Sequence, residues 1–165
     1  MNRSLLTIIL LLFVCMMSAD AQVAVSNVKG DAFGKSVYGL GFAIGPASGA
    51  GISYRLHTEG KTSLQAVLGV FKPKNTDTFY SFGVEFQQDL TRSSSARFFF
   101  GAASSYYYNG AGGNRYDAPF RLGAGLGGEF LLQDAVHITF QGLLTYFSDG
   151  SILPMPQISF HYYFY

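Results

Sequence analysis

From residue 36 onward, hydrophobic and polar residues alternate along the chain with a period of two. Turn-forming residues divide this pattern into eight stretches, which run roughly over residues 36–45, 49–57, 62–71, 78–88, 96–107, 119–132, 135–147 and 156–165. Because successive side chains of a β-strand point to opposite faces, each stretch predicts a strand with one apolar and one polar face. Short connections favour antiparallel neighbours. The pattern therefore predicts an all-β, eight-stranded antiparallel up-and-down β-barrel.

The apolar face of these strands carries no charged residue and is rich in Phe, Tyr, Leu, Ile and Val, as at Leu40, Phe82 and Phe140. The opposite face is rich in Gly, Ser, Thr and Gln. The interior of an eight-stranded barrel holds only a few layers of side chains, too few for the apolar set. If the apolar face meets lipid, the small and polar residues fill a crowded lumen. We therefore predict a transmembrane β-barrel, with a soluble periplasmic barrel that binds a ligand inside as an alternative.

The connections fit a barrel whose first strand rises from the periplasm. The expected periplasmic turns are residues 57–62, 89–95 and 133–134, and the expected external loops are residues 46–48, 72–77, 108–118 and 148–155. All five prolines are expected in loops or at strand starts, where a missing amide donor is tolerated. The longest external loop holds a candidate surface-ligand site that comprises Asn109, Asn114, Arg115, Tyr116 and Asp117. The tyrosines near this rim fit an interfacial aromatic girdle equally well.

The N-terminus has the features of a secretory signal peptide. A basic start is followed by an apolar run over residues 5–17 and by Ala19-Asp20-Ala21. We expect cleavage after Ala21, a periplasmic segment over residues 22–35, and a barrel over residues 36–165. The only cysteine, Cys15, lies within the signal. Lipidation there is disfavoured because Val14 precedes it, and the mature chain has no thiol for a disulfide or a metal site.

Composition narrows the classes of function. The 165-residue chain has a formal net charge of +1 and 13% charged residues, against about a quarter in soluble domains. No basic stripe for nucleic acid is present. The Gly123-x-Gly125-x-x-Gly128 run matches a dinucleotide fingerprint only formally, because no helix is predicted to follow it. We expect no cofactor and no metal.

The predicted lumen contains a small set of ionisable residues. They are Arg55, Glu85, Arg97, Arg121, Glu129 and His137. Strand directions place Arg121 toward the outside and the other five in the periplasmic half. Buried charges are tolerated when they are paired and hydrogen-bonded, so we expect an arginine–glutamate network that plugs the barrel. A charged constriction in a narrow solute channel is the alternative.

No catalytic site is expected. An outer-membrane lipid-modifying enzyme needs a nucleophile and a base near the external leaflet. His137-x-Thr139 resembles the His-x-Ser pair of a lipid A deacylase, but threonine replaces serine, and His137 is expected inward near the periplasmic end. We therefore favour a non-enzymatic protein.

The last strand ends on aromatic residues. Phe160, Tyr162, Phe164 and Tyr165 resemble the C-terminal signal by which the barrel assembly machinery recognises outer-membrane proteins. Over about 130 residues, the pattern resembles the small eight-stranded outer-membrane barrels: the OmpA transmembrane domain, OmpX and the opacity-type proteins. The resemblance implies the outer membrane of a Gram-negative bacterium, contact with outer-membrane lipid and lipopolysaccharide, and a structural or surface-interaction role with an unidentified surface ligand. It includes a few lipid A-modifying enzymes. The short external loops depart from the adhesin branch.

Overall fold

The computed structural model describes residues 33–72, 77–110, 113–133 and 135–165. The expected signal peptide and most of the expected periplasmic segment lie outside these residues. The strands are β1 (Val37–Gly45), β2 (Gly49–His57), β3 (Thr62–Phe71), β4 (Thr78–Arg92), β5 (Ala96–Gly110), β6 (Phe120–Gln133), β7 (Val136–Phe147) and β8 (Ile152–Phe164). No helix in the described part of the chain is long and apolar enough to cross a membrane.

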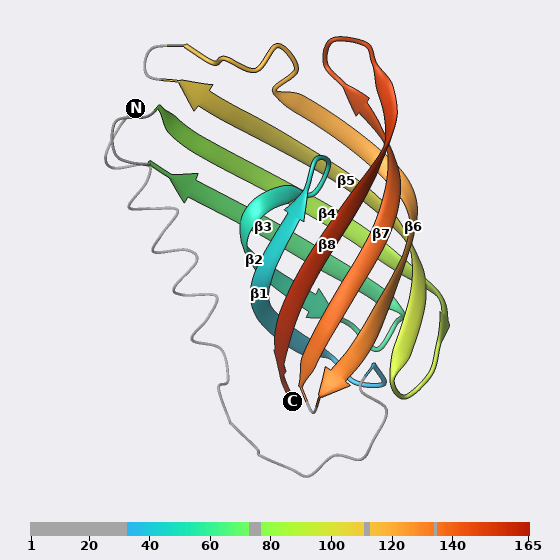
Figure 1. Cartoon of the computed structure of the whole chain (residues 1–165). Helices are drawn as coiled ribbons and strands as arrows, with labels where there is room; N and C mark the ends of the chain where they lie inside the picture. The colour runs from blue at the N-terminus through green and yellow to red at the C-terminus, as the bar shows by residue number, and fades with distance from the viewer. Residues whose placement is uncertain (1–32, 73–76, 111–112, 134) are drawn as a thin grey trace.

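The strands form one closed barrel in sequence order, from β1 to β8 (Figure 1). Each strand is antiparallel to its neighbours, and β1 pairs with β8 to close the sheet. The prediction of an all-β, eight-stranded up-and-down barrel is confirmed. We call the end that carries the β2–β3, β4–β5 and β6–β7 turns and the C-terminus the lower end. The β3–β4, β5–β6 and β7–β8 connections lie at the upper end.

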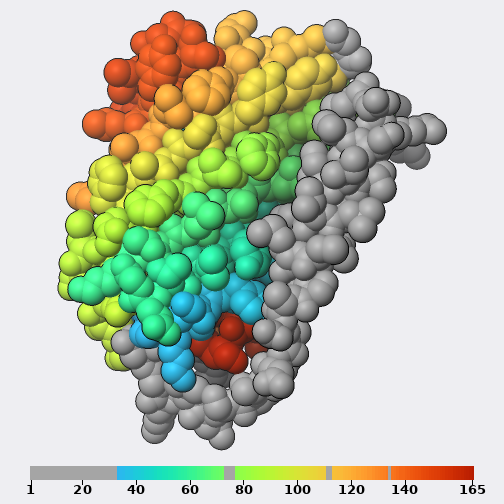
Figure 2. All heavy atoms as spheres, turned by 180° about the vertical axis from the view of Figure 1, so that it is seen from behind, coloured from blue at the N-terminus to red at the C-terminus, as the bar shows by residue number. Residues whose placement is uncertain are grey.

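The faces of the strands are inverted relative to a soluble barrel. Large apolar side chains such as Phe42, Leu68 and Phe140 point outward and are exposed, whereas Arg55, Glu129 and other polar residues are buried in the lumen. Figure 2 shows β3, β4 and β5 from outside as oblique bands of side chains. The period-two alternation therefore assigned the two faces correctly.

Three strands are longer than their expected stretches. β4 continues to Arg92, β5 to Gly110, and β8 begins at Ile152. Pro154 and Pro156 consequently lie inside β8 and not in a loop or at a strand start, which corrects the prediction. Both are paired with β7, at Leu144 and Gly142. These prolines are tolerated because β8 has no partner strand on its other side at this height. A missing amide donor on that side breaks no hydrogen bond of the sheet.

The β1–β2 turn, residues 46–48, was expected as an external loop, and this was wrong. β1 and β2 are the shortest strands, and their turn lies at about mid-height of the barrel, below the β5–β6 and β7–β8 connections (Figure 1). Ala47 and Ser48 are buried. Gly49, with φ of 97°, adopts the left-handed conformation that lets the chain turn back inside so tightly.

Candidate functional site

The lower half of the lumen is organised around the carboxylate of Glu129. Its Oε2 accepts hydrogen bonds from Arg55 Nη1 at 2.7 Å and from Arg97 Nη2 at 2.6 Å. Its Oε1 lies 3.0 Å from His137 Nδ1 and 3.5 Å from His57 Nε2. All four partners and Glu129 itself are buried. One carboxylate from β6 thus joins side chains of β2, β5 and β7.

Both arginines have further acceptors, so their guanidinium groups are well satisfied. Arg55 also donates to Thr139 at 2.7 Å, to Ser159 at 2.8 Å and to Gln65. Arg97 also donates to Asp89 Oδ1 at 2.6 Å and to Gln87. A buried charge is costly unless its hydrogen bonds are made. Here the neighbouring and facing strands supply acceptors for both guanidinium groups. The network therefore holds the lower lumen closed.

An aromatic layer lies on this network at the lower end. Phe33 packs edge-on against His137, with ring centroids 5.1 Å apart, and against His57 at 5.7 Å. Its carbonyl accepts a hydrogen bond from Arg92 Nη1 at 2.9 Å. Tyr163 packs on the same two histidines, at 4.5 and 4.9 Å. Phe33, which precedes β1, thus contributes to closing the lumen.

Glu85 lies beside this network and is linked to it through Gln87, which accepts from Arg97. Its Oε1 accepts from Gln87 Nε2 at 2.7 Å and its Oε2 from Gln141 Nε2 at 2.9 Å. Within the described residues it makes no ion pair. The two buried glutamates are thus held differently, Glu129 by cations and Glu85 by amides.

The β1–β2 turn fills the lumen above this network. Ser48 donates its backbone N–H to Gln157 Oε1 at 2.8 Å. The Pro46 carbonyl accepts from the Ser105 hydroxyl at 2.7 Å. The Gly45 carbonyl accepts from Tyr107 OH at 2.6 Å.

Glycines on the facing strands make room for this turn. A Cβ placed on Gly83 of β4 would lie 2.0 Å from the Ser48 carbonyl oxygen, and one on Gly123 of β6 would lie 2.6 Å from the Ala47 Cβ. The turn therefore contacts β4, β5, β6 and β8. The alternation of the sequence places both glycines on the lumen face but does not indicate what they accommodate.

Arg121 lies apart from the other predicted lumen charges. Its guanidinium carbon lies 4.2 Å from the centroid of the Tyr107 ring, 5.1 Å from Phe147 and 5.6 Å from Tyr116. Its Nε donates to the Ala118 carbonyl at 3.3 Å. Arg121 is therefore an upper-lumen residue stacked on aromatic rings, and no ion pair links it to the Glu129 network.

The candidate surface loop is held by Asn114. Its Oδ1 accepts from the backbone N–H of Asn109 at 3.0 Å and of Tyr116 at 3.1 Å, and its Nδ2 donates to the Tyr107 carbonyl at 2.8 Å. Arg115 is exposed and pairs with Asp77 across the rim at 2.6 Å. Asp117 is exposed. The described residues on either side of this loop are thus joined by the Asn114 side chain, with charges at its edge.

The aromatic C-terminus divides between the two faces. Phe160, Tyr162 and Phe164 are exposed on the outer surface. Tyr165 instead reaches the lumen, where its hydroxyl lies 2.8 Å from His137 Nε2. The terminal residue therefore completes the lower network.

Several members of the network could not be identified from sequence. His57 was assigned to a turn, and Asp89 to the next one, because both lie where the alternation stops. Gln65 and Gln87 have the inward parity, but nothing in the sequence pairs them with particular arginines. Strand parity was the only available signal.

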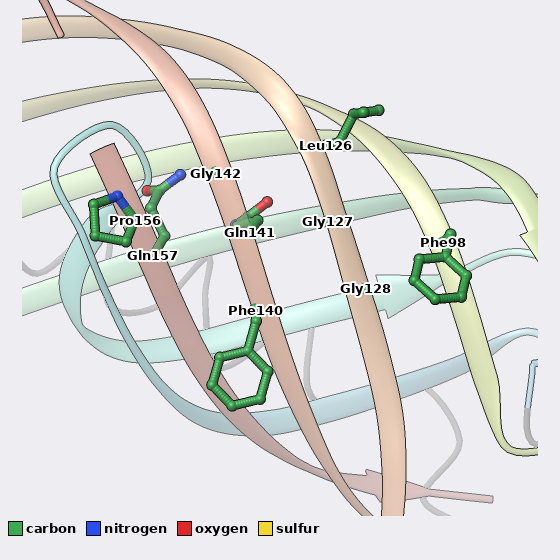
Figure 3. Close-up of a pocket in the computed structure, with 9 residues that line it drawn as sticks. All are labelled: Phe98, Leu126, Gly127, Gly128, Phe140, Gln141, Gly142, Pro156 and Gln157. Atoms are coloured by element: carbon green, nitrogen blue, oxygen red, sulfur yellow. The ribbon is translucent and has the colours of Figure 1, made fainter. Parts of the chain in front are cut away.

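A hollow of about 400 Å³ lies in the outer surface of β5 to β8. It lies where the outward-facing Gly128 and Gly142 have no side chains, and Phe98, Leu126, Phe140 and Pro156 surround it (Figure 3). Its lining is apolar apart from Gln141 and Gln157. A chain of methylene groups fits such a surface better than a polar ligand does.

Two arrangements bear on metal binding and nucleophilic catalysis in the described part of the chain. The described residues contain no cluster of three or more histidine, cysteine, aspartate or glutamate side chains that could hold a metal ion. Ser53 Oγ lies 2.8 Å from His161 Nε2, but both are buried, and His161 Nδ1 has no partner among the described residues that could orient the ring.

Comparison of the chain with protein-family models, with curated proteins and with solved structures found no match in any of the three.

Proposed function

We propose that this chain is a non-enzymatic outer-membrane β-barrel protein of a Gram-negative bacterium, with a plugged lumen and a structural or surface-interaction role. The observation that carries the proposal is the inversion of the barrel: apolar side chains outside, charged side chains inside. An outer face in lipid accounts for this arrangement, because the large apolar side chains then meet hydrocarbon while the charged side chains pair inside the lumen, and the closed sheet satisfies most strand hydrogen bonds. Similarity to the OmpA, OmpX and opacity-type barrels is part of this proposal and is supported by strand number and connectivity.

The contents of the lumen favour a closed barrel and argue against a solute channel. Two independent obstructions lie in series, the Glu129 network in the lower half and the β1–β2 turn above it. Opening a path would require breaking several charge-assisted hydrogen bonds, each of which is worth about 1.5–3 kcal/mol. A narrow solute channel would instead need a continuous hydrated path through the lumen.

The same closure argues against an enzyme of the lipid A-modifying kind. The serine–histidine pair at Ser53 and His161 lies below the turn, where a lipid substrate has no route. The external rim, with the Asn114-held loop and the Arg115–Asp77 pair, is the surface that a partner outside the cell would meet. In this proposal, lipopolysaccharide and other outer-membrane lipids contact the apolar outer surface of the barrel. The barrel assembly machinery is the partner during insertion.

The decisive experiment is fractionation of cells that express the full chain, followed by electrophoresis of boiled and unboiled samples. We expect the protein in the outer-membrane fraction with a band that shifts on boiling. A soluble periplasmic protein without a shift would overturn the membrane proposal. Purified protein in planar bilayers should give no steady single-channel openings, and regular openings would favour the channel. A change in lipid A mass on expression would favour the enzyme.

A further inference from the structure

The barrel wall is incomplete on one side of its upper half. The uppermost pairs are Ile44↔Ile158 between β1 and β8, and Ile52↔Leu68 between β2 and β3. β8 nevertheless continues upward to Ile152, and β3 to Phe71. Because the β1–β2 turn bends into the lumen, residues 152–156 of β8 and 70–71 of β3 have no strand between them, whereas Gly69 still lies against Ala50 of β2. We call this opening the side gap.

Apolar side chains that face the lumen are left exposed at both edges of the side gap. Phe71 pairs with Phe79, which packs against the buried Tyr107, yet Phe71 is 65% exposed. Leu153 pairs with the buried Thr145 and is 49% exposed. Elsewhere in the barrel, lumen-facing side chains at mid-strand are covered. The missing wall is what exposes these two.

Two prolines keep the edge of β8 from pairing with another strand. Pro154 and Pro156 lie two residues apart, so their nitrogens are on the same side of the strand. The ladder to β7 is continuous through both, which places the nitrogens on the side of the gap. An edge without amide donors does not accept an added strand. The occupant of the side gap is therefore not a β-strand of a partner or of a second copy.

The side gap begins at the level of a group of outward tyrosines on neighbouring strands. These tyrosines, Tyr80, Tyr106, Tyr108 and Tyr146, lie on β4, β5 and β7. Tyr80 pairs with Val70 on one edge of the gap, and Tyr146 pairs with Ile152 on the other. Tyrosine favours the membrane–water interface. The gap thus extends from the interface down into the apolar belt.

Arg121 supplies a positive charge inside this upper lumen. Arg121 lies on β6, two strands from the β8 edge of the gap, and it pairs with Phe147 on β7. No carboxylate of the described residues forms an ion pair with it. Aromatic rings hold the guanidinium without neutralising it.

The carboxylates nearby are engaged elsewhere or point outward. Asp77 pairs with Arg115. Asp149, in the β7–β8 turn, accepts from the backbone N–H of Ser151 at 2.9 Å and from its hydroxyl at 2.7 Å, which lowers the pKa of that carboxyl. Asp117 is exposed on the loop. The upper lumen therefore has a net positive site.

We propose that the upper lumen and the side gap bind an anionic lipid of the surrounding leaflet, with its acidic head group at Arg121 and one acyl chain between β3 and β8. The inference rests on the proposed membrane location. Phe71 and Leu153 contact the chain, and the β1–β2 turn forms the floor that stops it from entering the lower lumen. The head group needs no route through the closed barrel, because the gap opens sideways into the bilayer.

The absence of tryptophan from the chain allows a direct test. A single tryptophan is introduced as Leu153→Trp in the gap or as Leu144→Trp on the outer face of β7, and each protein is folded into phosphatidylcholine vesicles. Quenching is then measured with brominated phosphatidylglycerol or brominated phosphatidylcholine as the minor lipid. Heat-modifiability on gels verifies that each variant has folded.

We expect both tryptophans to be quenched, and only Leu153→Trp to favour the anionic lipid, by about threefold, the ratio that a partly exposed ion pair supplies. Adding Arg121→Gln should abolish this preference, whereas Lys61→Gln, at the lower end, should leave it unchanged. Equal quenching of Leu153→Trp by both lipids, or none, would overturn the proposal. Loss of quenching at Leu144→Trp as well would instead show that the barrel is not in the bilayer, which is a failure of the proposed function.

Discussion

Ala47, in the β1–β2 turn, packs against Gly123 of β6 so closely that a Cβ added to Gly123 would lie 2.6 Å from the Ala47 Cβ. The two residues are far apart in sequence and meet only because the turn enters the lumen. A contact this close leaves no room for a methyl group on β6. The glycine is therefore a requirement of the plug and not merely of the strand.

Gly123→Ala should lower the free energy of unfolding by about 1–3 kcal/mol, because the added methyl overpacks the lumen. Ala47→Gly in the same protein should recover part of that loss, with a coupling of about 1 kcal/mol. Urea-induced unfolding in lipid vesicles measures both. Gly142→Ala is the matched control, since a Cβ there meets nothing within 4 Å. Additive effects of the two substitutions would mean that the turn does not lie against β6.

Glu129→Gln should be the most damaging isosteric change in the lumen. It leaves Arg55 and Arg97 buried without their shared anion, and breaking a buried ion pair in this way costs about 3–5 kcal/mol. The same unfolding measurement applies. Glu59→Gln, in the exposed β2–β3 turn, should change stability by less than about 0.5 kcal/mol. Equal stability of the two variants would contradict the network.

Tyr165→Phe should cost about 1 kcal/mol of stability and leave assembly intact. The change removes the hydroxyl that lies 2.8 Å from His137 Nε2 but keeps the aromatic terminus. Tyr162→Phe, on the outer face near the same end, should be neutral in stability. The amount of heat-modifiable protein in the outer membrane should match wild type for both. A loss of assembly with Tyr165→Phe would show that the hydroxyl itself is needed for insertion.

Replacing both Pro154 and Pro156 by valine should restore two amide donors at the open edge of β8. Unpaired edge strands associate with one another, so we expect barrel dimers that chemical crosslinking in vesicles detects. Replacing Pro119, which precedes β6, by valine is the control and should leave the protein monomeric. A double variant that stays monomeric would mean that the prolines do not protect the edge.

The sequence alone determined the strands, their antiparallel order and the two faces. A period of two is a local property, so Phe82 and Glu85 were assigned to opposite faces without knowledge of any partner strand. Strand ends were less certain at β4, β5 and β8, because Asp89, Asn109 and Pro154 are residues typical of turns. In the structure, pairing with a neighbouring strand carries each of these strands past its expected end.

Only the tertiary structure decided what fills the lumen. Three small residues, Pro46, Ala47 and Ser48, read as an ordinary loop, and nothing local reveals that they turn inward onto Gly83 and Gly123. Three other features also depend on the tertiary structure alone. They are the pairing of the arginines with Glu129 rather than Glu85, the contact of Tyr165 with His137, and the side gap between β3 and β8. Each depends on the register between strands distant in sequence, and that register is set when the sheet closes.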